Sequence, residues 1–243
     1  MKALILAGGK GTRFLEETNT RPKPMIEING KPMLLHIIEQ YIRFGIFEFI
    51  ILGGYKIEVI HNYFKNKKLN NDGDYFYKEK GITIKILETG LETQTGGRVK
   101  KAKDYLDDTF LLTYGDGLAN VNISESIKFH EKQNRLATVT AVRPPARFGS
   151  LTIDGESVIS FGEKISTNEG WINGGFFVLN KKVLNFIDGD ETIFEKKPLE
   201  ELASSNNLSA FKHNGFFYPV DTIREKEIVE NLISNNKLSW LND

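Results

Sequence analysis

Residues 2–25, KALILAGGKGTRFLEETNTRPKPM, contain the features that decide the fold of this chain. The apolar run 3–7 predicts a short buried strand, and the glycine-rich segment 8–13 ends it. Because glycine has no Cβ, such a loop brings backbone N–H groups close to anionic oxygens. Arg13 and Lys23 add cations, a planar guanidinium and a point charge, that suit phosphate groups. The stretch therefore predicts a strand followed by a loop that binds a triphosphate.

Two better-known phosphate-binding loops do not match this segment. A P-loop needs Ser or Thr after its Gly-Lys pair, but Gly11 follows Lys10 here. The dinucleotide motif G-x-G-x-x-G needs a glycine where Phe14 stands. The alternative to ligand binding is an ordinary glycine turn with solvated cations. The combined spacing of the glycines, Arg13 and Lys23 favours the binding loop.

The composition is that of an ordinary globular protein. The chain has 243 residues, of which 40% are hydrophobic and 26% charged, which is ample for a sizeable core. Basic and acidic residues both total 32, so net charge favours neither nucleic acid nor an anionic membrane as a partner. The absence of cysteine excludes disulfides, thiol nucleophiles and cysteine metal sites. The first apolar run is too short for a signal peptide or a membrane span, so we expect a cytoplasmic protein.

Strands and helices alternate through the first half of the chain. Apolar strands are expected at 47–52, 82–87, 109–113 and 137–142, and the helices between and around them at 32–44, 56–64, 99–106 and 123–133. This alternation predicts an α/β fold with a doubly wound, mostly parallel sheet. The polar segment 66–77 is interpreted as a surface excursion, and the short strands with glycine turns in 148–179 predict a small antiparallel subregion.

These features predict a single domain over residues 1–243. Its expected parts are a nucleotide-binding part over about 1–120, an acceptor-binding part over about 137–221, and a C-terminal helix over about 222–235.

Two aspartates follow expected strands and are candidate metal ligands. Asp116 stands in the sequence TYGDG after the strand at 109–113, and Asp221 follows segment 216–220 and opens the last helix. Ligands of open α/β sheets sit outside the carboxyl ends of strands, and two carboxylates are a common minimal protein contribution to a Mg²⁺ site. The alternatives are a turn aspartate at 116 and a helix cap at 221, although Thr222 is equally able to cap.

Other polar segments are candidates for substrate contact. The loop TGGR at 95–98 is expected to enter a helix. Its free N–H groups either contact a base edge or a ribose, or belong to an ordinary helix entry. Lys164 and Asn173 flank the antiparallel subregion, where they either contact a second substrate or line turns.

Taken together, the motifs resemble those of sugar-phosphate nucleotidylyltransferases, and among these most of all the glucose-1-phosphate cytidylyltransferases. The matching segments span nearly the whole chain and are AGGKGTR, RPKPM, GGY, TGGR, TYGDG, PPARFG, INGGFFVL and FYPVDT. The resemblance implies a Rossmann-like α/β domain, Mg²⁺ as cofactor, CTP and a phosphorylated sugar as substrates, and a homo-oligomer.

The resemblance also implies roles for residues. Arg13 and Lys23 are the expected catalytic residues, at the leaving pyrophosphate and the α-phosphate, and Asp116 with Asp221 is expected to hold Mg²⁺. The expected nucleotide-binding positions are Leu6, Ala7, Gly8, Gly9, Gly11, Thr12, Arg13, Thr95, Gly96, Arg98 and Gly115. The expected acceptor-binding positions are Tyr114, Arg147, Glu163, Lys164, Asn173 and Gly174.

The acceptor is the open part of this interpretation. Overall similarity favours glucose 1-phosphate, but Ile165 and Ser166 stand where the family usually has proline and lysine, and Trp171 replaces a smaller residue. A polyol or glycerol phosphate is therefore the alternative acceptor. A regulatory nucleotide-binding protein on the same scaffold is the alternative of a different class. Both cations and both carboxylates are present, which favours the enzyme.

Overall fold

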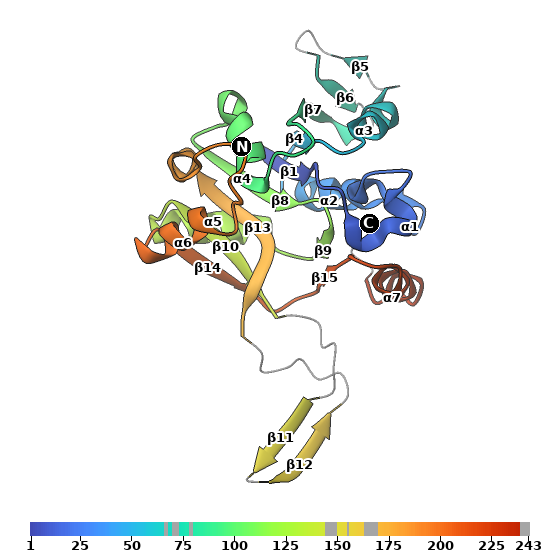
Figure 1. Cartoon of the computed structure of the whole chain (residues 1–243), viewed down its shortest axis with the longest axis vertical. Helices are drawn as coiled ribbons and strands as arrows, with labels where there is room; N and C mark the ends of the chain where they lie inside the picture. Colours follow the sequence, from blue (N-terminus) through green and yellow to red (C-terminus); the bar gives the residue numbers. More distant parts are fainter. Residues whose placement is uncertain are drawn as a thin grey trace.

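A nine-stranded sheet forms the centre of the molecule in this computed structural model (Figure 1). The structure describes residues 1–65, 68–69, 73–77, 80–143, 150–154, 156–162 and 170–238. The strand order is β14-β10-β13-β8-β1-β4-β7-β6-β5. The strands are β1 (Ala3–Ala7), β4 (Glu48–Gly53), β5 (Lys68–Leu69), β6 (Tyr75–Tyr77), β7 (Ile82–Glu88), β8 (Thr109–Tyr114), β10 (Ala137–Val142), β13 (Ile172–Asn180) and β14 (Leu208–His213).

Seven of the nine strands run in the same direction, although the eight neighbouring pairs divide into four parallel and four antiparallel ones. The pairs β1–β4, β1–β8, β4–β7 and β10–β14 are parallel. Strand β13 is antiparallel to both of its neighbours, β10 and β8, and β6 is antiparallel to β7 and β5. The predicted mostly parallel α/β sheet is therefore confirmed.

Helices cover both faces of the sheet (Figure 1). They are α1 (Leu15–Thr18), α2 (Met33–Ile42), α3 (Ile57–Phe64), α4 (Thr95–Lys101), α5 (Ile123–Gln133), α6 (Lys197–Ser204) and α7 (Ile223–Ser234). Short 3-10 turns occupy Thr12–Phe14, Lys23–Met25, Lys103–Tyr105 and Lys181–Phe186. Small two-stranded sheets pair β2 (Glu27–Ile28) with β3 (Lys31–Pro32), β9 (Gly117–Ala119) with β15 (Phe217–Pro219), and β11 (Ser150–Asp154) with β12 (Ser157–Gly162).

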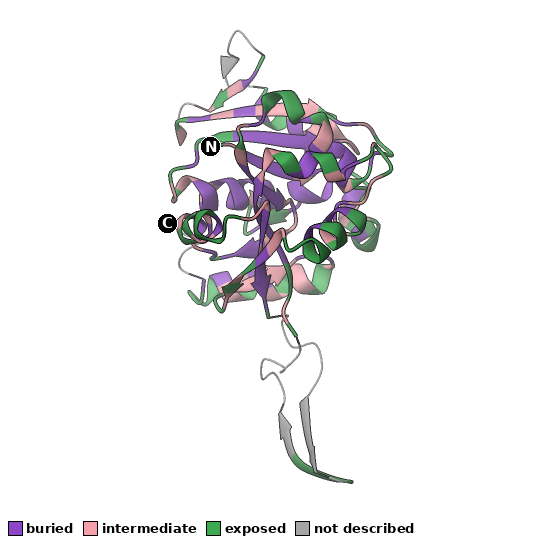
Figure 2. Ribbon diagram, turned by 90° about the vertical axis from the view of Figure 1, so that its left-hand side faces the viewer, coloured by how far each residue is buried: buried purple, intermediate pink, exposed green. Residues whose placement is uncertain are grey.

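Alternation along the strands creates two hydrophobic cores. In β1, Ile5 packs into the core shared with α2, α3 and α7, whereas Leu4 packs into the core shared with α4 and α6. Both side chains are fully buried, which contributes roughly 1.5–3 kcal/mol each. Figure 2 shows the buried residues concentrated in the sheet and on the inner sides of the helices. Helices thus bury apolar side chains on both faces of the sheet.

Two expectations from the sequence need correction. Helix α4 begins at Thr95, so TGGR forms its first turn and is not a loop before a helix at 99. The segment 66–77 contributes β5 and β6, which extend the main sheet because β6 pairs with β7. The expected antiparallel strands are present. β11 and β12 pair with each other, and the apolar β13 lies antiparallel between β10 and β8 in the main sheet.

No helix in the described ranges is long and apolar enough to cross a bilayer.

Candidate active site

A cavity of about 630 Å³ opens at the carboxyl ends of β1 and β8. All but one of the predicted site residues that the structure describes line it. They are Leu6, Ala7, Gly8, Gly9, Gly11, Thr12, Arg13, Lys23, Thr95, Arg98, Tyr114, Gly115, Asp116, Asn173, Gly174 and Asp221. The exception is Gly96. The expected acceptor residues Arg147, Glu163 and Lys164 lie outside the described residues.

The loop after β1 is fixed from behind by hydrogen bonds. The Gly8 carbonyl accepts from the backbone N–H of Tyr55 at 3.1 Å and from the Arg98 guanidinium at 3.0 Å. Gly11 has a φ of +61°, which L-residues with side chains rarely adopt, and a Cβ there would lie 2.8 Å from Thr18 Cγ2. Glycine is therefore required for the local path of this loop.

Arg98 supports the loop and does not point a free guanidinium into the cavity. Its side chain is 4% exposed and donates to Thr89 Oγ1 at 2.5 Å, to the Gly90 carbonyl at 2.8 Å and to Gly8. Burial lowers the pKa of the guanidinium, but an arginine remains charged at neutral pH. This cation therefore lies directly behind the glycine loop, and direct recognition of a nucleotide by Arg98 stays a prediction.

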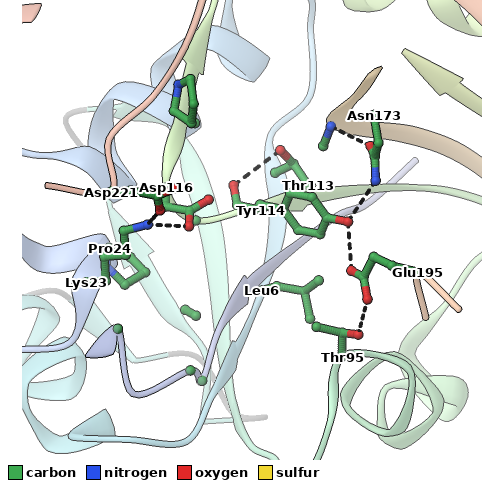
Figure 3. Close-up of a pocket in the computed structure, with 18 of the residues that line it drawn as sticks. Leu6, Lys23, Pro24, Thr95, Thr113, Tyr114, Asp116, Asn173, Glu195 and Asp221 are labelled. Atoms are coloured by element: carbon green, nitrogen blue, oxygen red, sulfur yellow. Dashed lines mark hydrogen bonds and ion pairs between the residues drawn. The ribbon is translucent and has the colours of Figure 1, made fainter. Parts of the chain in front are cut away.

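The two cations and two carboxylates predicted from the sequence form one cluster, and Figure 3 shows Lys23 in contact with Asp116 and Asp221. Lys23 Nζ donates to Asp116 Oδ2 at 2.6 Å and also contacts the Asp221 carboxylate. Arg13 donates to the other oxygen of Asp221 at 2.6 Å. The Lys23 side chain is only 9% exposed, whereas the Arg13 side chain is 74% exposed. A buried cation thus joins the ends of two separate strands, and a second cation lies at the cavity mouth.

The helix-cap interpretation of Asp221 is not needed. The Thr222 hydroxyl accepts from the backbone N–H of Glu225 at 3.3 Å and caps α7. The backbone N–H of Asp221 donates to the Glu225 carboxylate at 2.8 Å. The Asp221 carboxylate is therefore left to face Lys23 and Arg13.

The carboxylates of Asp116 and Asp221 fit a divalent cation chemically. They converge on the Lys23 ammonium from β8 and β15, and oxygen ligands of this kind suit Mg²⁺. Within the described part of the chain no three His, Asp or Glu side chains cluster to hold a metal. Two protein ligands are thus what the chain offers here, and phosphate and water would complete the coordination.

A second network crosses the other side of the cavity (Figure 3). The Tyr114 hydroxyl donates to Glu195 Oε1 at 2.7 Å and accepts from Asn173 Nδ2 at 3.0 Å. Glu195 Oε2 accepts from the Thr95 hydroxyl at 2.5 Å. Burial, and next the Glu195 charge, raise the pKa of Tyr114, so the phenol stays a hydrogen-bond donor.

The glycines of TGGR serve packing. A Cβ on Gly96 would lie 2.7 Å from the Thr192 carbonyl oxygen, and one on Gly97 would lie 2.6 Å from Asp190 Cα. The N–H groups of both glycines donate to the Thr192 carbonyl, at 2.9 and 3.3 Å. The expectation that these N–H groups are free for a base or ribose is therefore wrong, because segment 190–192 occupies them.

Sequence reasoning missed several residues that line the cavity. They are Pro24, Thr93, Gln94, Thr113, Gly117, Ile172, Gly175, Phe176, Glu195, Phe217 and Pro219. Most are neighbours of predicted positions and follow from the same strand ends. Glu195 is different because it lies in the charged segment DETIFEKK, where no periodicity or motif distinguishes one acidic residue from the next.

The fold and the cavity define an α/β protein that places two cations, Arg13 and Lys23, beside two carboxylates, Asp116 and Asp221. The chain matches the nucleotidyl transferase family over residues 2–222 and belongs to that family. The predicted resemblance and the predicted enzyme class, a nucleotidyltransferase, are confirmed.

Within this family, the chain is similar to several individual proteins. The chain is 45% identical to the glucose-1-phosphate cytidylyltransferase of Salmonella typhi, over 99% of this chain and 98% of that protein. It is 43% identical to the probable glucose-1-phosphate cytidylyltransferase of Bacillus subtilis, over 98% and 96% of the two chains. HddC from Yersinia pseudotuberculosis, in complex with GMP-PN, superimposes with a TM-score of 0.72 at 25% identity, over 96% of this chain and 99% of that one.

Proposed function

We propose that this protein transfers the cytidylyl group of CTP to glucose 1-phosphate, giving CDP-glucose and pyrophosphate. The observation that carries the proposal is the Arg13–Lys23–Asp116–Asp221 cluster at the strand ends, in a chain 45% identical to a cytidylyltransferase over nearly its full length. The relatives support the choice of cytosine and glucose. Cytoplasmic location and a homo-oligomeric assembly stay predictions.

In the proposed reaction an oxygen of the acceptor phosphate attacks the α-phosphorus of CTP in line. A new P–O bond forms, the bond from the α-phosphorus to the bridging oxygen breaks, and pyrophosphate leaves. The attacking phosphate is already anionic, so no general base is required. Catalysis is then mainly positioning and neutralisation of charge.

Each charged residue has a part in this proposal. The exposed Arg13 binds the leaving pyrophosphate, and Lys23 binds the α-phosphate region from within the cavity. Asp116 and Asp221 hold Mg²⁺, which when bound neutralises charge on the phosphates. Backbone groups of the loop after β1 bind the nucleoside, and Thr95 at the start of α4 lies on this nucleotide side. Tyr114, Asn173 and Gly174 bind the acceptor.

A substrate panel tests the proposal. The purified protein is incubated with Mg²⁺, with CTP, UTP, GTP or ATP, and with glucose 1-phosphate, mannose 1-phosphate or glycerol 3-phosphate, while pyrophosphate release is measured. We expect CTP with glucose 1-phosphate to give the highest kcat/KM, in the range of about 10⁴–10⁸ M⁻¹s⁻¹. A higher value with another nucleotide contradicts the cytidylyl assignment, and one with glycerol 3-phosphate contradicts the acceptor. Binding of CTP without any turnover favours a regulatory nucleotide-binding protein.

A further inference from the structure

Glu195 connects the two halves of the cavity through its two carboxylate oxygens (Figure 3). One oxygen accepts from Thr95 at the start of α4, on the proposed nucleotide side. The other accepts from Tyr114 at the end of β8, on the proposed acceptor side. Asn173 on β13 extends this series of hydrogen bonds by donating to the Tyr114 hydroxyl. Elements distant in sequence are thus joined by a continuous series of hydrogen bonds.

The segment that carries Glu195 is itself fixed on α4. The backbone N–H of Phe194 donates to the Thr95 hydroxyl at 2.9 Å, and the Thr192 carbonyl accepts from the first turn of α4. The Thr95 hydroxyl therefore accepts one bond from this segment and donates another to Glu195, which fixes its rotamer. Hydrogen bonds to a charged carboxylate are stronger than those between neutral groups. Thr95 and Glu195 thus hold each other in one orientation.

The Tyr114 hydroxyl depends on Glu195 for its orientation. The phenol O–H lies 2.7 Å from Glu195 Oε1 and donates to it, because a carboxylate oxygen only accepts. Because the hydroxyl proton is donated to Glu195, a lone pair of the hydroxyl oxygen faces the side-chain amide of Asn173 and accepts from it. The side-chain oxygen of Asn173, Oδ1, in turn accepts from the Gly175 backbone N–H at 2.8 Å. Both acceptor-side residues are therefore oriented by one carboxylate.

We propose that Glu195 is a positioning residue that aligns Tyr114 and Asn173 with the nucleotide side by binding Thr95 and Tyr114 together. The inference rests on the proposed function, because it uses the assignment of Tyr114 and Asn173 to the acceptor. Its consequence is that a change at Thr95, on the nucleotide side, weakens productive binding of the acceptor. Misplacement by about 1 Å is enough to cost up to about 100-fold in rate.

The test compares the separate KM values for CTP and the acceptor in Glu195→Gln, Thr95→Val and the double variant. We expect each single variant to raise the acceptor KM about tenfold, the size expected from one lost charged hydrogen bond, and the CTP KM by clearly less. The double variant should raise the acceptor KM no further than the worse single variant, because both substitutions break one series of bonds. Glu201→Gln, an exposed glutamate on α6, is the matched control and should match the wild type.

Results that overturn the proposal differ from those that overturn the proposed function. A Thr95→Val variant that changes only the CTP KM, or additive effects in the double variant, refutes the positioning role. Thr95→Val also keeps the test decisive if Glu195→Gln does not fold. The wild type is measured first: if it uses another substrate pair, the proposed substrates are wrong and the variants are compared with that pair. A wild type without turnover on any pair refutes both.

Discussion

Asp116 is the residue whose replacement tests the catalytic cluster with the smallest structural change. Asn keeps the shape of the side chain but removes the charge that faces Lys23 at 2.6 Å. We expect Asp116→Asn to lower kcat/KM by about 10²-fold or more, since a preorganised charge at the transition state contributes a few kcal/mol. Asp188→Asn, which removes an exposed carboxylate paired with Lys197, should leave the rate unchanged. An Asp116→Asn rate within about threefold of the wild type would disprove the assigned role.

Lys23 has a structural role besides the proposed catalytic one. Its ammonium contacts both aspartates, and its side chain and that of Asp221 are 9% and 12% exposed. Lys23→Ala removes the buried cation between the two carboxylates and leaves the exposed Arg13 as the partner of Asp221, so we expect a loss of about 3 kcal/mol in unfolding free energy. Urea unfolding without ligand measures this loss, and millimolar Mg²⁺ should recover part of it. Lys226→Ala, which breaks a more exposed pair with Glu17, should cost less than about 1 kcal/mol.

An unchanged urea midpoint in Lys23→Ala would show that the cluster contributes nothing to stability. Mg²⁺ that stabilises the wild type and Lys23→Ala equally would show that the metal does not replace the lost ammonium.

At the scale of elements, the contact between α4 and segment 190–192 depends on glycine. A Cβ on Gly97 would approach backbone atoms of Asp190 to 2.6–2.7 Å, so the segment must shift to accept a side chain. We expect Gly97→Ala to destabilise the fold by about 1–3 kcal/mol and to lower kcat/KM, because Glu195 follows on the same segment. Gly189→Ala is the control, since a Cβ there has no atom within 4 Å. Thermal unfolding and initial rates measure both effects, and equal behaviour of the two variants would refute the packing role.

The sequence predicted the positions of strands better than it predicted which long-range contacts the loops and helix ends make. The strand predicted at 137–142 coincides with β10. Asn122, a residue type preferred at helix N-caps, accepts from Glu125 N at 3.0 Å and caps α5. Apolar periodicity and capping depend on residues close in sequence, so the sequence alone predicts them. The Thr192 carbonyl that occupies the first N–H groups of α4 is about one hundred residues away in sequence, and Glu195 is selected by the same long-range packing. No local pattern reports such contacts.

At the scale of the whole molecule, buried and half-buried histidines make stability depend on pH. Burial lowers the pKa of His36, His130 and His213 below the ordinary value of 6.5. The unfolded chain therefore binds more protons than the native protein as the pH falls through about 6.5, and protonation favours unfolding. We expect the unfolding free energy to decrease from pH 7.5 to 5.5, by at most about 1.4 kcal/mol per pH unit for each histidine. Urea midpoints at constant ionic strength measure it, and a midpoint that rises on acidification contradicts this account.

The central claim is the class of reaction, and phosphorus NMR of one reaction mixture tests it most directly. The protein is mixed with Mg²⁺, CTP and glucose 1-phosphate, and the resonances are followed with time. The account predicts that the signals of CTP and glucose 1-phosphate decline together, while pyrophosphate and the nucleotide sugar CDP-glucose appear in equal amounts. Release of inorganic phosphate with CDP, or CTP that stays intact beside unchanged glucose 1-phosphate, would contradict it.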